Sequence, residues 1–285
     1  MALQIKTHED SGNQPILDKA SGQLRLPKEV FTGALWFCHI ENLKTEVEKS
    51  KVEVMQPGPE VINRLSESRI LVDGKLERTA NQLLTIINKA SLEVQIDIQI
   101  GSQISSSFIW ATSSRAVRAN SLDGINIDLQ PIAAERVPQT ITDFIVIARS
   151  DTDGESPIAI SYEIIKAVKR LGKARTLEAF QSGGLDETSA QTLTEFLGNN
   201  SRKWKITSTW STENANESSS IQGIDAGEKG HWLIGHTGTD ENPGQMNYTP
   251  LTQSDITKSL RSVMPKMWST KPVRDGLLDL KHLGL

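Results

Sequence analysis

The sequence has few of the features that place a protein outside the cell or in a membrane. It holds one cysteine, Cys38, so no disulfide can form within the chain, and a lone thiol fits a reducing compartment. No run approaches the roughly 20 apolar residues that a membrane-spanning helix needs. The first residues are polar and charged, unlike a secretory signal. We therefore expect a cytoplasmic protein without stable membrane insertion.

A strong charge imbalance is also missing. The 285 residues include 31 Lys and Arg against 35 Asp and Glu, which gives a net charge of -4. Such a balance offers no electrostatic reason to expect a nucleic-acid partner. Hydrophobic residues make up 37% of the chain, which is enough for a sizeable core. The composition therefore favours a globular protein with neither nucleic acid nor a membrane as its partner.

Recognisable catalytic, metal and cofactor motifs are absent as well. Cys38 and His39 are neighbours on a predicted helix and point in different directions, so they do not form a nucleophile pair. His231 and His236 are five residues apart on a predicted strand and face opposite sides, so they cannot hold one metal ion. Residues 235–239 lack the Gly-Lys-Ser/Thr ending of a phosphate loop and favour a hairpin turn. We expect no enzyme activity, no catalytic residues, no cofactor and no metal. A small-molecule enzyme stays the less favoured alternative, because catalytic groups meet only in the fold.

What the sequence does contain is a repeated apolar pattern. Adding 110 to the numbers of Gly74, Ala80, Leu83, Ile86, Ile87, Val94 and Ile96 leads to Gly184, Ala190, Leu193, Phe196, Leu197, Trp204 and Ile206. Adding 119 to Pro131, Ile132, Val137, Ile141, Phe144 and Ile145 leads to Pro250, Leu251, Ile256, Leu260, Val263 and Met264. Adding 134 to Leu24, Leu26, Glu29, Val30 and Phe31 leads to Ile158, Ile160, Glu163, Ile164 and Ile165. The three matches occur in the same order, which indicates two copies of one folding unit.

Each copy is predicted to run strand–helix, helix, three antiparallel strands, helix. Val94 to Ile100 alternates apolar and polar residues, as a half-buried strand does. A single copy would expose one apolar sheet face and one apolar helix stripe, so we expect the two copies to cover each other. The predicted fold is α+β and quasi-two-fold symmetric, with a central antiparallel sheet flanked by helices. The predicted boundaries are a flexible tail over 1–22, one pseudosymmetric domain over 23–268 with half-repeats 23–150 and 157–268, and a C-terminal extension over 269–285.

Three stretches resemble the EspG family, the cytosolic chaperones of actinobacterial type VII (ESX) secretion. Ile70–Leu76, with the helix and strand that follow it up to Ile100, is similar to the recurring turn, helix and first sheet strand of that family. Leu24–Phe31 resembles its opening strand and helix, and the stretch from Trp232 to Trp268 resembles its last strand and helix. The resemblance covers residues 24–268 and lies in hydrophobic pattern and element order.

The resemblance implies a specificity chaperone without catalytic residues or cofactor. Such a protein binds the helical tip of a secreted PE/PPE-like heterodimer, keeps the pair soluble and delivers it to the secretion machinery. Another small helical secreted protein as client, or an interaction protein unrelated to secretion, are the alternatives. Matched by element, the partner-binding residues implied are Ser102, Gln103, Ile104, Phe180, Leu185, Leu193, Phe196 and Trp210. Trp210 is also a large aromatic residue at a predicted strand end, which is typical of interface anchors.

Overall fold

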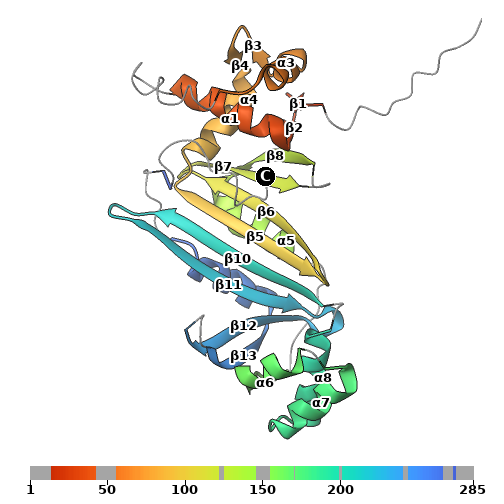
Figure 1. Ribbon diagram of the computed structural model, residues 1–285. Helices are drawn as coiled ribbons and strands as arrows, with labels where there is room; N and C mark the ends of the chain where they lie inside the picture. Colours follow the sequence, from red (N-terminus) through yellow and green to blue (C-terminus); the bar gives the residue numbers. More distant parts are fainter. Residues whose placement is uncertain are drawn as a thin grey trace, which may run out of the picture.

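An antiparallel sheet of 11 strands forms the centre of the molecule, and helices pack against it (Figure 1). The computed structural model describes residues 14–42, 56–121, 125–145, 155–169, 171–198, 201–239, 243–265 and 272–273. Every pair of neighbouring strands in the large sheet is antiparallel. The predicted α+β class is confirmed.

The first half of the chain contributes six strands of this sheet and the helices at one end of it. In order, its elements are β1 (Ile16–Asp18), β2 (Gln23–Pro27), α1 (Lys28–Asn42), α3 (Pro59–Glu67), the small hairpin β3 (Leu71–Val72) and β4 (Lys75–Leu76), α4 (Arg78–Asn88), β5 (Leu92–Ile100), β6 (Gln103–Ala111), β7 (Arg115–Ser121), β8 (Asn126–Ala133), the 3-10 turn Ala134–Arg136 and α5 (Val137–Ile145).

The second half repeats this order with five strands. Its elements are β9 (Ile158–Ser161), α6 (Tyr162–Val168), α7 (Lys173–Ser182), α8 (Glu187–Phe196), β10 (Arg202–Ser211), β11 (Asn216–Asp225), the 3-10 turn Gly227–Lys229, β12 (His231–Gly238), β13 (Pro243–Leu251) and α9 (Gln253–Ser262). The strand order across the sheet is β1-β2-β8-β7-β6-β5-β10-β11-β12-β13-β9. Outward from the central pair, the first half runs β5-β6-β7-β8-β2 and the second half runs β10-β11-β12-β13-β9. The two halves therefore have the same strand order, and β1 is an additional strand at the edge of the first half.

The two halves meet at the β5–β10 pair, where the strand register agrees with the sequence repeat. Ile96 lies directly opposite Ile206, and 96 + 110 = 206, so the two residues are also equivalent in the repeat. An approximate two-fold axis therefore passes through this pair. The turn glycines Gly74 and Gly184 are equivalent too, and both have a positive φ, of 74° and 96°. Glycine suits both turns, because other residues rarely adopt this backbone conformation.

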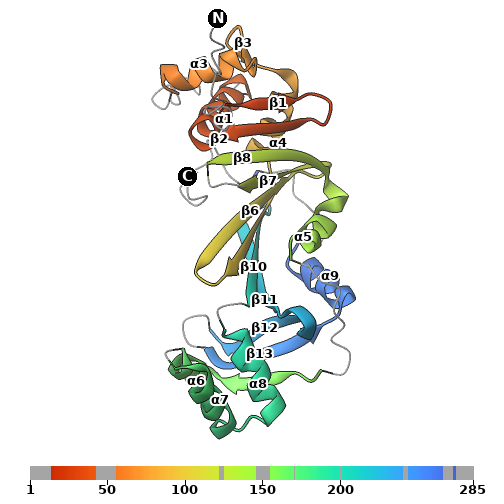
Figure 2. The same ribbon diagram turned by 90° about the vertical axis from the view of Figure 1, so that its right-hand side faces the viewer.

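Three apolar clusters form the core. One lies beneath α1, α3 and α4, and another lies beneath α6, α7 and α8. The third lies on the opposite face of the central strands, where α5 and α9 cover residues such as Ile96, Ile109 and Ile206. Figure 2 shows α5 and α9 on one side of the sheet, with the other two groups of helices at its two ends. Between those ends, no described helix covers the face of the central strands that is opposite to α5 and α9.

Three details of the sequence prediction need correction or remain open. Ile16–Asp18 lies in the predicted flexible tail, yet it forms β1 and pairs with β2. In the predicted C-terminal extension, Val273 is buried and donates a backbone hydrogen bond to the Ala90 carbonyl. The predicted turn at 235–239 lies further along, because β12 continues to Gly238 after an irregularity in register at His236. The domain boundaries themselves stay a prediction, and residues 1–13, 151–154 and 274–285 lie outside the described residues.

Candidate functional site

A polar surface lies on the uncovered face of the central strands, between the two groups of end helices. Alternation along β5 and β10 turns Ile96 and Ile206 towards α5 and α9, so the residues next to them turn to this surface. They include Asp97 on β5 and its partner across the sheet, Lys205 on β10. Asp97 accepts hydrogen bonds from the Ser106 hydroxyl at 2.6 Å and from the Gln95 amide at 3.0 Å. We call this surface the central polar face.

The hairpin between β5 and β6 carries exposed apolar side chains at one end of this face. Gly101 makes the turn with a φ of 60°. Ile100 is 52% exposed and Ile104 is 67% exposed, on opposite faces of the hairpin. Ile104 pairs with Gln99, which pairs with Lys203 at the start of β10. Because neighbouring strands are about 4.8 Å apart, Ile104 and Lys203 share one face about 10 Å apart. Ile100, Ser102, Gln103 and Ile104 together are called the tip surface.

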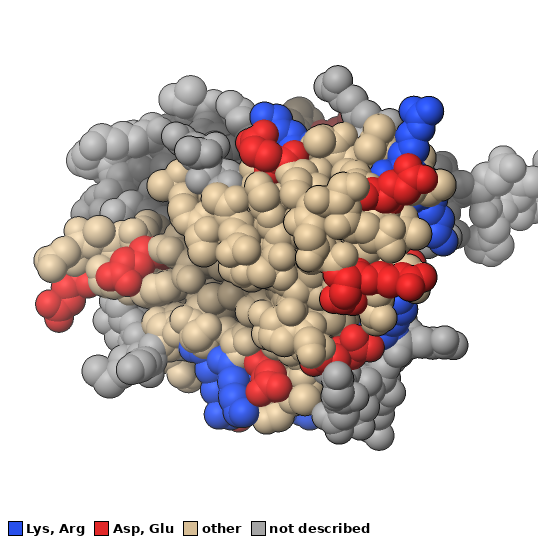
Figure 3. Space-filling model, turned by 90° about the horizontal axis from the view of Figure 1, so that it is seen from below, with Lys and Arg blue, Asp and Glu red and all other residues tan. Residues whose placement is uncertain are grey.

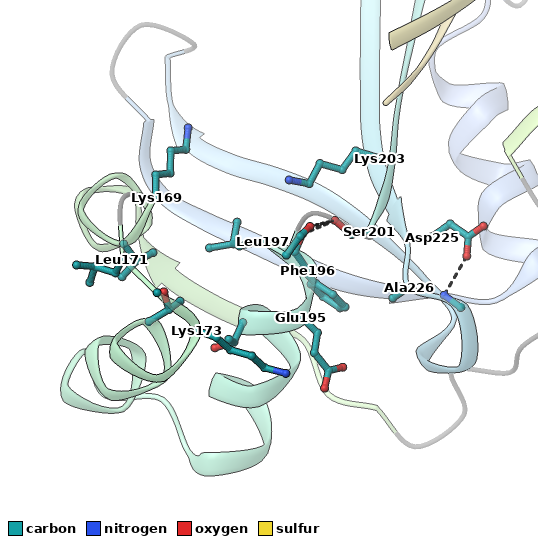
Figure 4. Close-up of a pocket in the computed structure, with 16 residues that line it drawn as sticks. Lys169, Leu171, Lys173, Glu195, Phe196, Leu197, Ser201, Lys203, Asp225 and Ala226 are labelled. Atoms are coloured by element: carbon teal, nitrogen blue, oxygen red, sulfur yellow. Dashed lines mark hydrogen bonds between the residues drawn. The ribbon is translucent and has the colours of Figure 1, made fainter. Parts of the chain in front are cut away.

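A cavity of about 1080 Å³ lies beside the start of β10 (Figure 4). The end of α6, the start of α7 and the end of α8 form one side, and β10 and the end of β11 form the other. Its lining is mixed, with Leu171, Phe196 and Leu197 next to charged residues. Ser201 fixes the connection from α8 to β10, because its hydroxyl donates to the Phe196 carbonyl at 2.7 Å.

Charged side chains of both signs line this cavity, but its carboxylates have cationic partners elsewhere. Glu195 pairs with Lys229, with 2.9 Å between the amine and a carboxylate oxygen. Asp225 lies 3.6 Å from Arg202, whose guanidinium also donates to the Ile145 and Phe144 carbonyls at the end of α5. The Asp225 carboxylate further accepts the backbone N–H of Gly227. Both acids therefore hold the walls of the cavity together.

Three lysines, Lys169, Lys173 and Lys203, line the same cavity. Figure 4 shows Lys169 and Lys203 on one side of it, while Lys173 extends on the other side towards Glu195. Partial burial lowers the pKa of Lys203, and the positive charge of Lys169 lowers it further.

The structure separates the eight predicted partner-binding residues into surface and core. Ser102, Gln103 and Ile104 are exposed on the tip surface. Phe180, Leu193 and Phe196 are at most 1% exposed, so a partner cannot reach their side chains in this conformation. They face the sheet because the apolar sides of α7 and α8 cover it, together with the partly buried Leu185.

Trp210 lies away from the other predicted contacts. It is opposite Leu92, at the end of β5 remote from Ile100, so about 27 Å of strand separates it from the tip surface. Its side chain packs partly buried on the cluster beneath α5 and α9. The structure therefore does not bring Trp210 together with Ile104, and partner binding by these residues stays a prediction.

The cavity lysines are not apparent from the sequence alone. Lys203 is recognisable as a polar position of an alternating strand, but Lys169 ends a helix 34 residues earlier. No periodicity links these two positions, and only the packing of α6 against the sheet brings them to one cavity.

Among the described residues, the remaining reactive groups do not assemble into a metal site. In the described ranges, no three His, Cys, Asp or Glu side chains are placed to hold a metal ion. Cys38 is buried under α4, and this burial raises the pKa of its thiol to about 11. No helix among the described residues is long and apolar enough to cross a membrane.

Seen from the end where α6, α7 and α8 lie, the molecule carries charged side chains mainly around its margin (Figure 3). The centre of this face consists of residues other than Lys, Arg, Asp and Glu.

Comparison with known proteins finds similarity at the level of the fold. No family model matches the chain, and no curated protein matches it. Among solved structures, the chain is similar to the Mycobacterium tuberculosis type VII secretion system chaperone EspG5, solved in complex with a PE25–PPE41 dimer. The match has a TM-score of 0.62 and 11% sequence identity, and it covers 88% of this chain and 99% of that one. The chain therefore has the fold of this chaperone over nearly its whole length.

Proposed function

We propose that the chain is a chaperone that binds a helical protein pair of the PE/PPE kind in the cytoplasm and keeps it soluble for type VII secretion. The observation that carries the proposal is the similarity of fold, over 88% of this chain, to a chaperone solved in complex with a PE25–PPE41 dimer. Delivery to the secretion machinery is part of the same proposal. A role of this kind requires a binding surface and no catalytic group.

The tip surface and the adjoining part of the central polar face are the proposed contact region. Among the described residues, six large hydrophobic side chains are exposed, and Ile100, Ile104 and Leu171 are three of them. Ile100 and Ile104 lie on the hairpin beside β10, and Leu171 lines the cavity at the start of β10. Ile104 lies on the same face as Lys203, which lines that cavity with Leu171, whereas Ile100 lies on the opposite face of the hairpin. Exposed apolar side chains at the end of the sheet favour a protein partner with an apolar end. Ser102 and Gln103 would add polar contacts at the edge of that region.

Binding to a purified PE/PPE-like pair from the same genome, measured by isothermal titration calorimetry, tests the proposal. We expect Ile104→Asp to weaken binding about tenfold or more, because a carboxylate would then face the apolar end of the partner. The fold should persist, since the Ile104 side chain is 67% exposed. Val72→Asp is a matched control, because Val72 is 50% exposed on the β3–β4 hairpin at the far end of the molecule (Figure 1).

Three outcomes would contradict the proposal. The first is the absence of binding to any such pair, with recovery of an unrelated protein, which would favour an interaction protein outside secretion. The second is equal affinity for wild type and Ile104→Asp. The third is an equal loss of affinity in Val72→Asp, which would indicate that the effect does not depend on the tip surface.

A further inference from the structure

At the end remote from the tip surface, a residue near the C-terminus of the chain binds to both halves of the central sheet. Val273 donates its backbone N–H to the Ala90 carbonyl at 2.7 Å, and its own carbonyl accepts the Asn216 side-chain amide at 2.6 Å. Ala90 lies just before β5 and Asn216 begins β11, so Val273 bridges the two strands on either side of β10. Its side chain is 8% exposed. We call this contact the Val273 strap.

The strap lies on the central polar face. Asn216 is opposite Ser211, and Trp210, the residue before Ser211, packs in the cluster beneath α5 and α9. Because side chains alternate along a strand, Ser211 and Asn216 turn to the other face, which is the central polar face. Leu92 also packs beneath α5 and α9, so Ser91 before it turns the same way as Ser211. The strap therefore closes this face where β5 begins and β10 ends.

Two hydroxyl groups beside the strap are closed off from water. Along the central polar face, Gln99 and Lys205 near the tip surface are exposed, whereas Ser91 and Ser211 are 2% and 3% exposed. In the part of the chain that the structure describes, neither of these serine hydroxyls has a hydrogen-bond partner. A buried hydroxyl without a partner costs free energy, which is regained when the group meets water or another polar group. This cost offsets part of the gain from the two hydrogen bonds and the buried valine, so it favours a strap that can open.

The distance between the tip surface and the strap matches the width of a protein interface. Ile104 lies in one row with Lys203, and Ser211 is eight residues further along β10. At about 3.3 Å per residue, the strap is about 27 Å from that row. A stable interface buries about 800 Å² on each partner, which corresponds to a patch about 28 Å across. A partner that binds at the tip surface and extends along the central polar face therefore reaches the strap.

We propose that the Val273 strap is an autoinhibitory contact, which closes this end of the central polar face in the free protein and is displaced when the protein partner binds. The inference rests on the proposed chaperone function and adds a step that lowers the affinity. Displacement would free the Asn216 amide and the hydroxyls of Ser91 and Ser211 for polar contacts with the partner. The apparent affinity falls with the fraction of molecules in which the strap is closed.

Two variants of the full chain weaken the strap, and each has a matched control. Val273→Ala removes most of the buried side chain, and Val263→Ala is its control, because Val263 is also buried but follows α9 on the opposite face of the sheet. Asn216→Ala removes the donor to the Val273 carbonyl, and Ser220→Ala is its control, because Ser220 is exposed on the same strand and the same face. The readouts are the affinity for a purified PE/PPE-like pair and hydrogen exchange at the Val273 amide.

We expect both strap variants to bind the pair about threefold or more tightly than wild type, and both controls to bind it as wild type does. In wild type, the Val273 amide should exchange faster when the pair is bound, because displacement breaks its hydrogen bond to the Ala90 carbonyl. The same amide should exchange faster in Asn216→Ala without any partner. This last result reports the opening of the strap independently of binding.

Three results would overturn the autoinhibitory role while the pair still binds. They are unchanged or weaker affinity in both strap variants, an equal gain in the controls, and exchange at the Val273 amide that stays the same or slows on binding. Slower exchange would make the strap a part of the interface, and unchanged exchange would mean that the partner does not reach it. Absence of binding to wild type and to both strap variants would instead contradict the proposed chaperone function, and this inference with it.

Discussion

At the scale of single residues, the two halves fill the same place in the central sheet with different pairs of side chains. In the first half, Val94 lies opposite Ile109. In the second half, the equivalent position is Trp204, and the residue opposite it is Gly223. A Cβ at Gly223 would lie 2.2 Å from the Trp204 ring and 2.5 Å from the Trp232 carbonyl oxygen. The glycine therefore provides the space that the indole of Trp204 occupies.

We expect Gly223→Ala to lower the free energy of unfolding by about 1–3 kcal/mol, because the added methyl group has no free space in a close-packed core. Urea denaturation followed by circular dichroism measures the change. Gly235→Ala on the neighbouring β12 is the control, since nothing lies within 4 Å of its added Cβ. In a Trp204→Val background, Gly223→Ala should lower the free energy of unfolding by less than it does in the wild type, because the smaller side chain gives the methyl group room. Equal stability of the Gly223 and Gly235 variants would show that Trp204 does not need this space.

At the scale of elements, α9 depends on a reciprocal cap at its first turn. The Thr252 hydroxyl accepts the Asp255 backbone N–H at 3.2 Å, and the Asp255 carboxylate accepts the Thr252 backbone N–H at 3.3 Å. Ile256 and Leu260 of this helix then pack in the cluster that α5 completes. The cap therefore fixes the start of a helix on which the centre of the sheet depends.

We expect Thr252→Ala to cost about 1 kcal/mol of stability, as N-cap replacements do, and Thr252→Ser to cost less because the hydroxyl remains. Hydrogen bonds from Thr252 and Lys258 hold the pKa of Asp255 below its ordinary value of 3.8. The bonds that the Asp255 carboxylate accepts from Thr252 are therefore fully present above pH 3.8 and are lost as pH falls through the lowered pKa. Thermal unfolding at several pH values should show the difference between wild type and Thr252→Ala shrinking in that acidic range. A difference that grows towards low pH would contradict this account of the cap.

Elements with local signals could be predicted from the sequence, whereas elements and contacts that depend on tertiary pairing could not. The helices α4 and α8 follow positive-φ glycines and carry apolar stripes, so their repeat was detectable at a fixed offset. β1 has no such signal, because its three residues form a strand only through pairing with β2. Phe196 and Ile104 are both apolar, and only the packing of α8 and the β5–β6 register decide that one is buried and the other exposed. The same reason hides the cavity formed around Lys169 and Lys203.

At the scale of the whole molecule, the centre of the sheet belongs to both halves equally. β5 and β10 pair along nine residues from each strand, from Leu92 opposite Trp210 to Ile100 opposite Arg202. The cluster beneath α5 and α9 also combines residues of both halves, among them Ile96 and Ile206. Either half alone would expose this apolar surface to water. We therefore propose that the two half-repeats form a single cooperative domain, although each has its own cluster beneath its end helices.

Ile206→Ala tests this cooperativity, because Ile206 is fully buried on the axis that relates the halves. We expect a loss of about 2–5 kcal/mol, as for other buried isoleucine truncations. If the domain unfolds as one unit, hydrogen exchange should speed up by the same factor in β8 and β13, which lie far from the substitution in opposite halves. Ile104→Ala, at an exposed position of the same sheet, should leave both strands protected. Faster exchange in β13 with unchanged protection in β8 would instead mean that each end cluster sustains its own half, and that the β5–β10 pairing joins two domains.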